Sequence, residues 1–329
     1  MTLPLLSVIV PTYKREQPLC LAIQDLLQQN HPSFEIIVVD QTPCHQVETQ
    51  SFLHQLATVG KIRWFRVDWA SLPAARNYGL QQAKGDIVVF VDDDVKIPPD
   101  FLSAHAAAYQ NSPKIAVIAG RVLDRAKQVK GKTIDMLPPE AMDPAIAWYY
   151  LDLVHTTTPQ SVLTARGCNM SFRSDVLRQN HIYFDERYGG SAIREESDVC
   201  LRLRQLGYDI WYAPDAVLTH LGEETGGCHT DSFKSLKYQA FFYHNHFWLA
   251  FKNLTWPQTW HTFSSLFRCQ VLPNTFPYYK RGGLHRILLR TGFYGLGLFW
   301  AIATVLQSPW QDGLHHNRPD GPSFETTHV

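Results

Sequence analysis

The stretch Asp86-Ile87-Val88-Val89-Phe90-Val91-Asp92-Asp93-Asp94 places five apolar residues between acidic ends. An apolar run this short and rich in β-branched residues predicts a buried strand with three carboxylates at its carboxyl end. Because side chains alternate along a strand, Asp92 and Asp94 should project to one side, where they could share a Mg²⁺ or Mn²⁺ bound to a diphosphate. One Asp would suffice to cap the helix that Pro98-Pro99-Asp100 predicts, so three in a row favour a metal–phosphate site.

The first 123 residues repeat this pattern of a short apolar strand followed by a helix. Further strands are predicted at Leu6–Val10, Phe34–Asp40, Ile62–Val67 and Lys114–Leu123. Helices are predicted from Pro18 and from Leu72, each with a proline near its start. Strands that alternate with helices indicate an α/β fold with a parallel, doubly wound sheet. Residues 124–158 lose the periodicity, and we interpret them as an insertion that flanks the active site.

More elements are predicted after this insertion. Ala165–Phe172 should be extended and lead into a helix capped by Ser174 or Asp175. Two more strands are predicted at residues 209–213 and 216–221. The second of them contains His220, and a lone histidine in a strand is more often structural than a metal ligand.

Arg194–Asp198 places three acids at the start of another predicted helix, which Gly207 ends. Acids in a first helical turn interact favourably with the helix dipole by roughly a few tenths of a kcal/mol without any catalytic duty. Their position alone therefore favours a catalytic role only weakly.

Composition restricts the class of protein. The 329 residues are 45% hydrophobic and 18% charged, which is typical of a folded protein. Thirty basic residues balance thirty acidic ones, so the overall charge does not indicate a nucleic-acid partner. The six cysteines show no paired spacing, which argues against structural zinc and a disulfide framework. The sequence opens without a basic, apolar leader, so we expect a cytoplasmic protein.

Residues 231–311 differ from the rest, because they carry eight Lys or Arg and the single acid Asp231, a net charge of +7. Trp256, Trp260, Phe263 and Phe267 recur there at helical spacing. The run Thr291–Leu306 is apolar but shorter than the roughly 20 residues of a simple membrane span. These features favour a helical region that lies on an anionic membrane surface over one that crosses it. The alternative is a helical subdomain packed on the catalytic core or a dimer contact.

Six motifs in order resemble family-2 glycosyltransferases of the GT-A fold. They are Ser7–Tyr13, the strand that ends at Asp40, Ala75–Gly79, Val91–Asp94, Gly167–Asn169 and Glu195–Asp198. The resemblance covers about the first 220 residues. It implies a Rossmann-like, mostly parallel sheet and an inverting enzyme that moves a sugar from a nucleoside diphosphate donor to a hydroxyl acceptor with a divalent metal.

The resemblance also assigns roles to residues. The donor-binding set is Pro11, Thr12, Tyr13, Arg15, Asp40 at the nucleobase, Arg76 near the diphosphate, Asp92 and Asp93. Asp92 and Asp94 fill the aspartate-x-aspartate motif, and His220 resembles a late histidine that completes metal coordination. Glu196 would be the catalytic base. Many relatives carry Glu-Asp where this chain carries Glu195-Glu196, so the choice between these two residues stays open.

The residue patterns and the family resemblance together predict the domain organisation. Residues 1–225 would form the catalytic domain, with the donor side at 1–123 and the acceptor side at 124–225. Residues 226–311 would hold the enzyme at the cytoplasmic face of a membrane, near a lipid-linked or polysaccharide precursor, and 312–329 would be disordered.

Two other functions compete with this one. A sugar-nucleotide nucleotidyltransferase should carry a glycine-rich phosphate loop after the first strand, but Pro11–Arg15 contains no glycine. A catalytically inactive sugar-nucleotide binding or scaffold protein would not need the retained acids.

Overall fold

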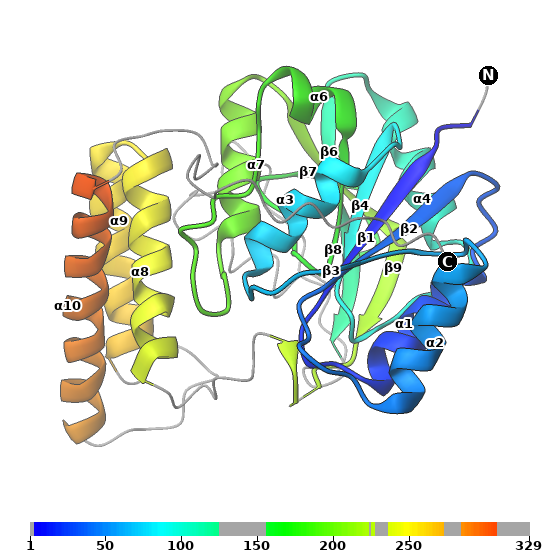
Figure 1. Ribbon diagram of the computed structural model, residues 1–329. Coiled ribbons are helices and arrows are strands. Elements are labelled where there is room, and N and C mark those ends of the chain that lie inside the picture. Colours follow the sequence, from blue (N-terminus) through cyan, green and yellow to red (C-terminus); the bar gives the residue numbers. More distant parts are fainter. Residues whose placement is uncertain (1–2, 125–155, 224, 228–235, 273–283, 308–329) are drawn as a thin grey trace.

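The computed structural model describes residues 3–124, 156–223, 225–227, 236–272 and 284–307. Most of the insertion predicted at 124–158 and the whole tail 312–329 lie outside these ranges. Within them, nine strands form one sheet in the order β3-β2-β1-β4-β8-β6-β9-β5, with β7 paired to β9 (Figure 1). The strands are β1 (Leu6–Thr12), β2 (Phe34–Asp40), β3 (Arg63–Arg66), β4 (Ile87–Val91), β5 (Val95–Lys96), β6 (Ile115–Asp124), β7 (Gln160–Val162), β8 (Asn169–Arg173) and β9 (Asp209–His220).

Helices cover both faces of the sheet, as the alternation of strands and helices predicts. They are α1 (Gln17–Leu27), α2 (Val47–Thr58), α3 (Leu72–Gln82), α4 (Phe101–Ala108), α6 (Ser174–Gln179) and α7 (Glu195–Gln205). Adjacent residues of β1 point to opposite faces, because Val8 packs in a core with α1 and α4 while Ile9 packs in a core with α3 and α7. The central strands β1 and β4 are thus buried on both sides, which explains their continuous apolar runs.

The sheet is mixed, which corrects the prediction of a parallel sheet in part. Strands β1 to β4 pair in parallel, but β8 runs antiparallel between β4 and β6. This direction pairs Val91 at the end of β4 with Asn169 at the start of β8. Gly167 and Cys168 are therefore brought close to the aspartates that follow β4.

Two local predictions also differ from the structure. The strands predicted at 209–213 and 216–221 are one strand, β9, which continues through a shift in its register against β6. The shift leaves residues 214–216 without partners in β6, and Pro214 among them has no backbone N–H to donate. Neither Ser174 nor Asp175 is the N-cap of α6. The Ser174 hydroxyl instead donates to the backbone oxygen of Gly85, 2.6 Å away.

Three helices after the sheet form a bundle, drawn in yellow and orange in Figure 1: α8 (Leu236–Asn253), α9 (Trp256–Leu266) and α10 (Leu284–Gln307). Phe247, Phe263 and Phe293 lie in their shared apolar core. The predicted aromatic face of α9 is divided, because Trp256 and Trp260 are 70% and 68% exposed while Phe263 is buried.

Helix α10 is longer than the apolar run from which it was predicted. Its 24 residues correspond to about 36 Å. Within the described residues it is the one helix with the length and hydropathy to cross a membrane, and only 11% of its apolar 18-residue stretch is buried. Its exposed large apolar residues are Leu284, Leu288, Leu289, Leu296, Phe299, Trp300, Ile302 and Leu306.

Buried ion pairs join the bundle to α7 and to the segment that precedes α7. The Lys252 ammonium of α8 lies 2.9 Å from Asp185 and 3.0 Å from Asp198 of α7, and all three side chains are buried. Trp248 also donates to Asp185, and Asn253 donates to Asp198. Lys252 therefore does not contribute to a basic surface, although the net charge of residues 231–311 includes it.

We expect Lys252→Met to destabilise the protein by about 3 kcal/mol, because two buried carboxylates lose a cation. Urea-induced unfolding measures the loss. The control is Lys61→Met, at an exposed loop residue, which should change the free energy of unfolding by no more than about 0.5 kcal/mol. Equal effects of the two substitutions would contradict a structural role for the buried ion pairs.

Candidate active site

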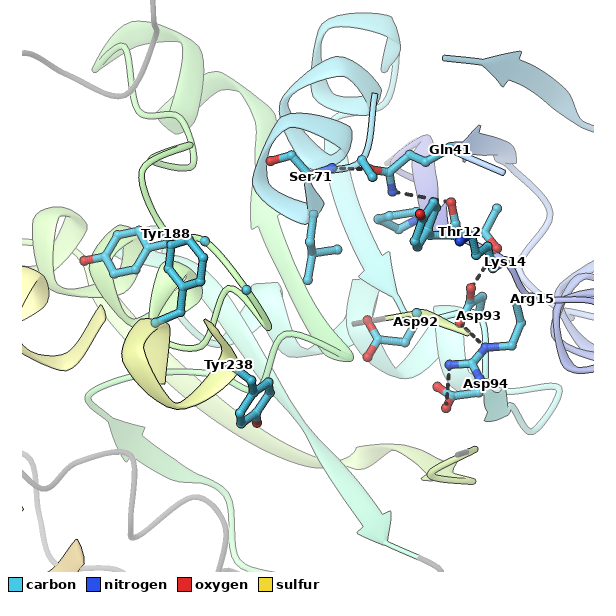
Figure 2. Close-up of a pocket in the computed structure, with 18 of the residues that line it drawn as sticks. Thr12, Lys14, Arg15, Gln41, Ser71, Asp92, Asp93, Asp94, Tyr188 and Tyr238 are labelled. Atoms are coloured by element: carbon cyan, nitrogen blue, oxygen red, sulfur yellow. Dashed lines mark hydrogen bonds and ion pairs between the residues drawn. The ribbon is translucent and has the colours of Figure 1, made fainter. Parts of the chain in front are cut away.

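A cavity of 610 Å³ lies where β1 and β4 end, between the sheet and helix α8 (Figure 2). Most of its lining residues come from the end of β1 with the following loop, from the aspartates after β4, and from a wall formed by residues 186–190 with α8. Gln41, residues 70–72, His220 and Gly227 complete the lining. The carboxyl ends of parallel strands are the usual ligand sites of open α/β sheets.

The end of β1 and the loop after it form one side of the cavity, and Pro11, Thr12, Tyr13 and Arg15 all line it. The side-chain amide of Gln41, directly after β2, donates to the backbone oxygen of Thr12 at 3.3 Å (Figure 2). Its side-chain oxygen accepts from the backbone N–H of Ser71 at 2.6 Å. The sequence interpretation missed Gln41 and Ser71. Their positions at a strand end and at the N-cap of α3 were the available signals.

Asp40 does not line the cavity, although the resemblance assigns it to the nucleobase. Its carboxylate is fully buried and accepts hydrogen bonds from Thr42, His45 and Trp64. Burial raises the pKa of Asp40, but the hydrogen bonds from His45 and Thr42 outweigh this effect and hold the pKa below its usual range. In this structure Asp40 fixes the loop that presents Gln41, and its contact with a base stays a prediction.

The three aspartates after β4 point in different directions, as Figure 2 shows. Asp93 turns inward, accepting from Thr12 Oγ1 at 2.7 Å and from Arg15 Nε at 3.0 Å. Burial raises the pKa of Asp93 to about 6, and the charge of Arg15 opposes part of this shift. Asp93 therefore anchors the loop that carries Arg15.

Asp92, Asp94 and His220 form a group that could bind a metal. Each offers one ligand atom, and these atoms lie within 4.8 Å of one another. The distance between His220 Nε2 and an Asp94 oxygen is 3.4 Å. Burial alone would raise the pKa of Asp94 and lower that of His220, but their mutual attraction outweighs burial in both cases. Two carboxylate oxygens and an imidazole nitrogen suit a divalent ion such as Mn²⁺, so these residues fit the expected metal.

Arg76 lies behind the aspartates and joins them to α7. Its guanidinium is 3.6 Å from Asp92, forms an ion pair with Glu195 and donates to the Gly167 oxygen at 3.0 Å. An added Cβ at residue 167 would lie 2.8 Å from Arg76 Nη2, so Arg76 keeps this position only with a glycine there. Arg76 is buried and does not line the cavity, so its guanidinium contacts Asp92 from the protein side.

Two of the three acids that α7 brings together occupy different surroundings. Glu195 is buried and paired with Arg76. Glu196 keeps a partly exposed surface, and its oxygen accepts from the Ser197 hydroxyl at 3.3 Å. Burial of the carboxyl group raises the pKa of Glu196, and the positive charge of Arg194 opposes this shift. Neither glutamate lines the cavity, whereas Glu186, which the sequence interpretation missed, does.

Helix α8 forms the wall opposite the aspartates. Lys237, Tyr238 and Phe241 line the cavity beside Gly189 and Gly190 (Figure 2). The Phe241 ring lies so close to Gly189 that an added Cβ there would overlap it. The acceptor side was predicted at residues 124–225, so α8 was missed. Aromatic residues at helical spacing occur both in cavity walls and in packed cores, so the sequence pattern could not show that α8 lines the cavity.

Solved structures share this fold. The structure of Staphylococcus aureus TarS 1–349 in complex with UDP-GlcNAc aligns with a TM-score of 0.56 at 18% identity, covering 89% of this chain and 81% of that one. The mannosyltransferase PcManGT from Pyrobaculum calidifontis, in complex with GDP-Man and Mn²⁺, aligns with a TM-score of 0.51 at 15% identity, covering 94% and 88%. These similarities confirm the GT-A fold with its helical C-terminal region.

Sequence comparison gives the family. The poly(ribitol-phosphate) β-N-acetylglucosaminyltransferase TarS of S. aureus is 27% identical over 184 residues, 55% of this chain and 29% of TarS. The GalNAc(5)-diNAcBac-PP-undecaprenol β-1,3-glucosyltransferase of Campylobacter jejuni is 36% identical over 104 residues, 31% of this chain and 33% of that enzyme. The matches thus span about a third of these relatives. The family described as glycosyl transferase family 2 matches residues 7–179, more than half of the chain, and the protein therefore belongs to that family.

Proposed function

We propose that this protein is an inverting glycosyltransferase that moves a sugar from a nucleoside diphosphate sugar to a hydroxyl acceptor. The observation that carries the proposal is the cluster of Asp92, Asp94 and His220 beside the loop of Thr12 and Arg15, in a chain of this family. This arrangement places negative metal ligands and a fixed cation at one end of a single cavity.

The donor would bind with its nucleotide against the loop after β1. Pro11, Thr12, Tyr13 and Gln41 line that side, and the rigid Gln41–Ser71 contact fixes its shape. A metal held by Asp92, Asp94 and His220 would supply Lewis-acid stabilisation of the diphosphate leaving group. Inversion needs one displacement, so the chain must provide one base and no nucleophile.

Glu196 is the base we propose, because Glu195 is neutralised by its ion pair with Arg76. The first turn of a helix favours the ionised carboxylate that must accept the acceptor's proton. Glu186 is the second candidate, because it is the one glutamate among the described residues that line the cavity.

The acceptor would enter between Glu186 and α8, where Tyr238 and Phe241 offer apolar surface to a sugar ring and Lys237 offers a positive charge. We propose a lipid-linked or polysaccharide precursor at the cytoplasmic face of a membrane. The curated relatives that act on poly(ribitol-phosphate) and on an undecaprenol-linked saccharide support this class of acceptor.

The apolar face of α10 supports the membrane location. The helix packs along α8, with Gly297 against Tyr243 and His244, and α8 is tied to the catalytic sheet through Lys252. A crossing α10 would pull these buried charged contacts toward the hydrocarbon, so the geometry favours a helix that lies in the interface.

Asp94→Asn should lower the Mn²⁺-dependent affinity for nucleotide by about 10-fold or more, because one anionic ligand becomes neutral while its shape is kept. Calorimetry with UDP and GDP, with and without Mn²⁺, measures this change. The matched control is Asp100→Asn, an exposed aspartate whose side chain makes no capping hydrogen bond. An unchanged Mn²⁺ effect in Asp94→Asn would refute the metal site.

Glu196→Gln should keep donor affinity and reduce kcat by about 100-fold or more, because an amide cannot accept the proton. In the wild type, kcat should fall as the pH drops through a pKa above the usual 4.3 of glutamate, since burial raises the pKa of the base.

Turnover of UDP-N-acetylglucosamine, UDP-glucose and GDP-mannose is measured for the wild type, for Glu196→Gln and for the control variants Glu195→Gln and Glu186→Gln. Loss of kcat in Glu186→Gln alone would transfer the role of base to Glu186. A wild type that binds these donors but turns none over, even by hydrolysis, would indicate a binding protein.

Replacing Leu289 and Phe299 together by Gln should weaken binding to vesicles of anionic lipid, because both residues are more than half exposed on α10. Co-sedimentation at low and high salt, with anionic and with neutral vesicles, measures the binding. Val59→Gln with Leu206→Gln, on the exposed surface of the catalytic domain, is the matched control. A wild type that stays in the supernatant with every vesicle would contradict the membrane proposal.

A further inference from the structure

Helix α8 reaches the start of α7 through a second buried contact. His246 Nε2 accepts a hydrogen bond from Arg194 Nε at 3.2 Å, and both side chains are at least 97% buried. The His246 Nδ1–H donates to the Phe242 backbone oxygen at 2.7 Å, which leaves Nε2 as the acceptor. Burial and the charge of Arg194 lower the pKa of His246 well below its usual value, so the ring stays neutral.

Arg194 is in an unusual position. It is the N-cap of α7, directly before Glu195 and Glu196, and its φ of +86° is in the left-handed region. This conformation is costly for a residue with a Cβ and persists only where surrounding contacts impose it. The Arg194 guanidinium donates to the Ser197 hydroxyl at 3.4 Å, and that hydroxyl donates to Glu196 at 3.3 Å. A chain of hydrogen bonds therefore runs from α8 to the proposed base.

We propose that His246 is a positioning residue for the transfer reaction: it holds Arg194 against Ser197 and so fixes the carboxylate of Glu196. This inference rests on the proposed function, because it takes Glu196 as the base. His246 acts through Arg194 and does not touch the substrate cavity. The bundle helix α8 thus contributes to the geometry of the base as well as to the wall of the cavity.

Loss of the His246–Arg194 contact should change the pKa of Glu196 in one direction. Charged and titratable groups that act on the Glu196 carboxyl are Arg194 at its own helix start, Arg76 from α3, Cys200 one turn along α7 and Tyr188 from the preceding loop. Arg194 has the largest lowering effect on the pKa of Glu196. If Arg194 is released from His246 and moves away, this pKa must rise, and the acid side of the kcat profile must move to higher pH.

His246→Leu is therefore expected to shift the acid limb of kcat upward by about one pH unit and to reduce turnover at pH 7 by about 10-fold. The affinity for UDP should not change. His246→Gln, whose Oε1 can accept from Arg194, should restore most of the wild-type profile. The assay uses whichever of UDP-N-acetylglucosamine, UDP-glucose and GDP-mannose the wild-type protein turns over fastest.

His244→Leu is the matched control, since His244 is equally buried on the same helix but bonds to Asn245 and to Thr304 of α10. It should leave the acid limb in place. Ser197→Ala removes the hydroxyl between Arg194 and Glu196 without altering α8, and should shift the limb in the same direction by a smaller amount. If His246→Leu does not fold, Ser197→Ala tests whether this chain of hydrogen bonds positions Glu196.

An acid limb that is the same in His246→Leu and His244→Leu would overturn the inference, as would an unchanged limb in Ser197→Ala. Failure of the proposed function looks different. In that case Glu196→Gln itself keeps its turnover, and another residue must be the base. If Glu196→Gln loses its turnover but His246→Leu leaves the acid limb of the kcat profile unchanged, only the positioning role of His246 is rejected.

Discussion

Three consecutive carboxylates at the end of β4 repel one another, and the surrounding structure compensates for this repulsion. Two unit charges 4 Å apart interact by about 4 kcal/mol at an effective dielectric constant of 20, which is a large fraction of the stability of a domain. Arg15 contacts Asp93 and Asp94, Arg76 contacts Asp92, and His220 contacts Asp94. The groups that offset this repulsion come from the loop after β1, from α3 and from β9, so the same interaction brings these parts of the structure together.

Arg76 links this cluster to the acids of α7. It sits between Asp92 and Glu195, and its position requires the absence of a side chain at Gly167. One guanidinium thereby attracts a carboxylate of the aspartate group and a carboxylate next to the proposed base. The pairing leaves Glu196 without that partner, which is a physical reason for two adjacent glutamates to have different roles. The Glu195-Glu196 sequence by itself could not distinguish them.

The sequence predicted most elements of the sheet because their patterns are local. Val8 and Ile9, or the apolar run before Asp92, carry a signal that needs no knowledge of distant residues. The direction of β8 carries no such signal, since the same apolar residues suit a parallel or an antiparallel neighbour. The region of the aspartates was predictable from their number and position at a strand end. Lys252 and Phe241 were not, because a cation or an aromatic on a helix has the same local pattern whether it faces solvent, a core or a cavity.

Helix α8 connects three parts of the molecule that the sequence separates. Its first turns carry Tyr238 and Phe241 into the cavity, His246 contacts the N-cap of α7, and His244 bonds to Thr304 of α10. The side of α10 away from α8 is exposed and apolar, at the edge of the molecule in Figure 1. A surface that binds α10 would therefore be connected to the acceptor wall by a single rigid helix. Such an arrangement suits an acceptor held at that surface, because α8, which forms a wall of the place where the acceptor would react, packs directly against α10, the helix that would attach the enzyme.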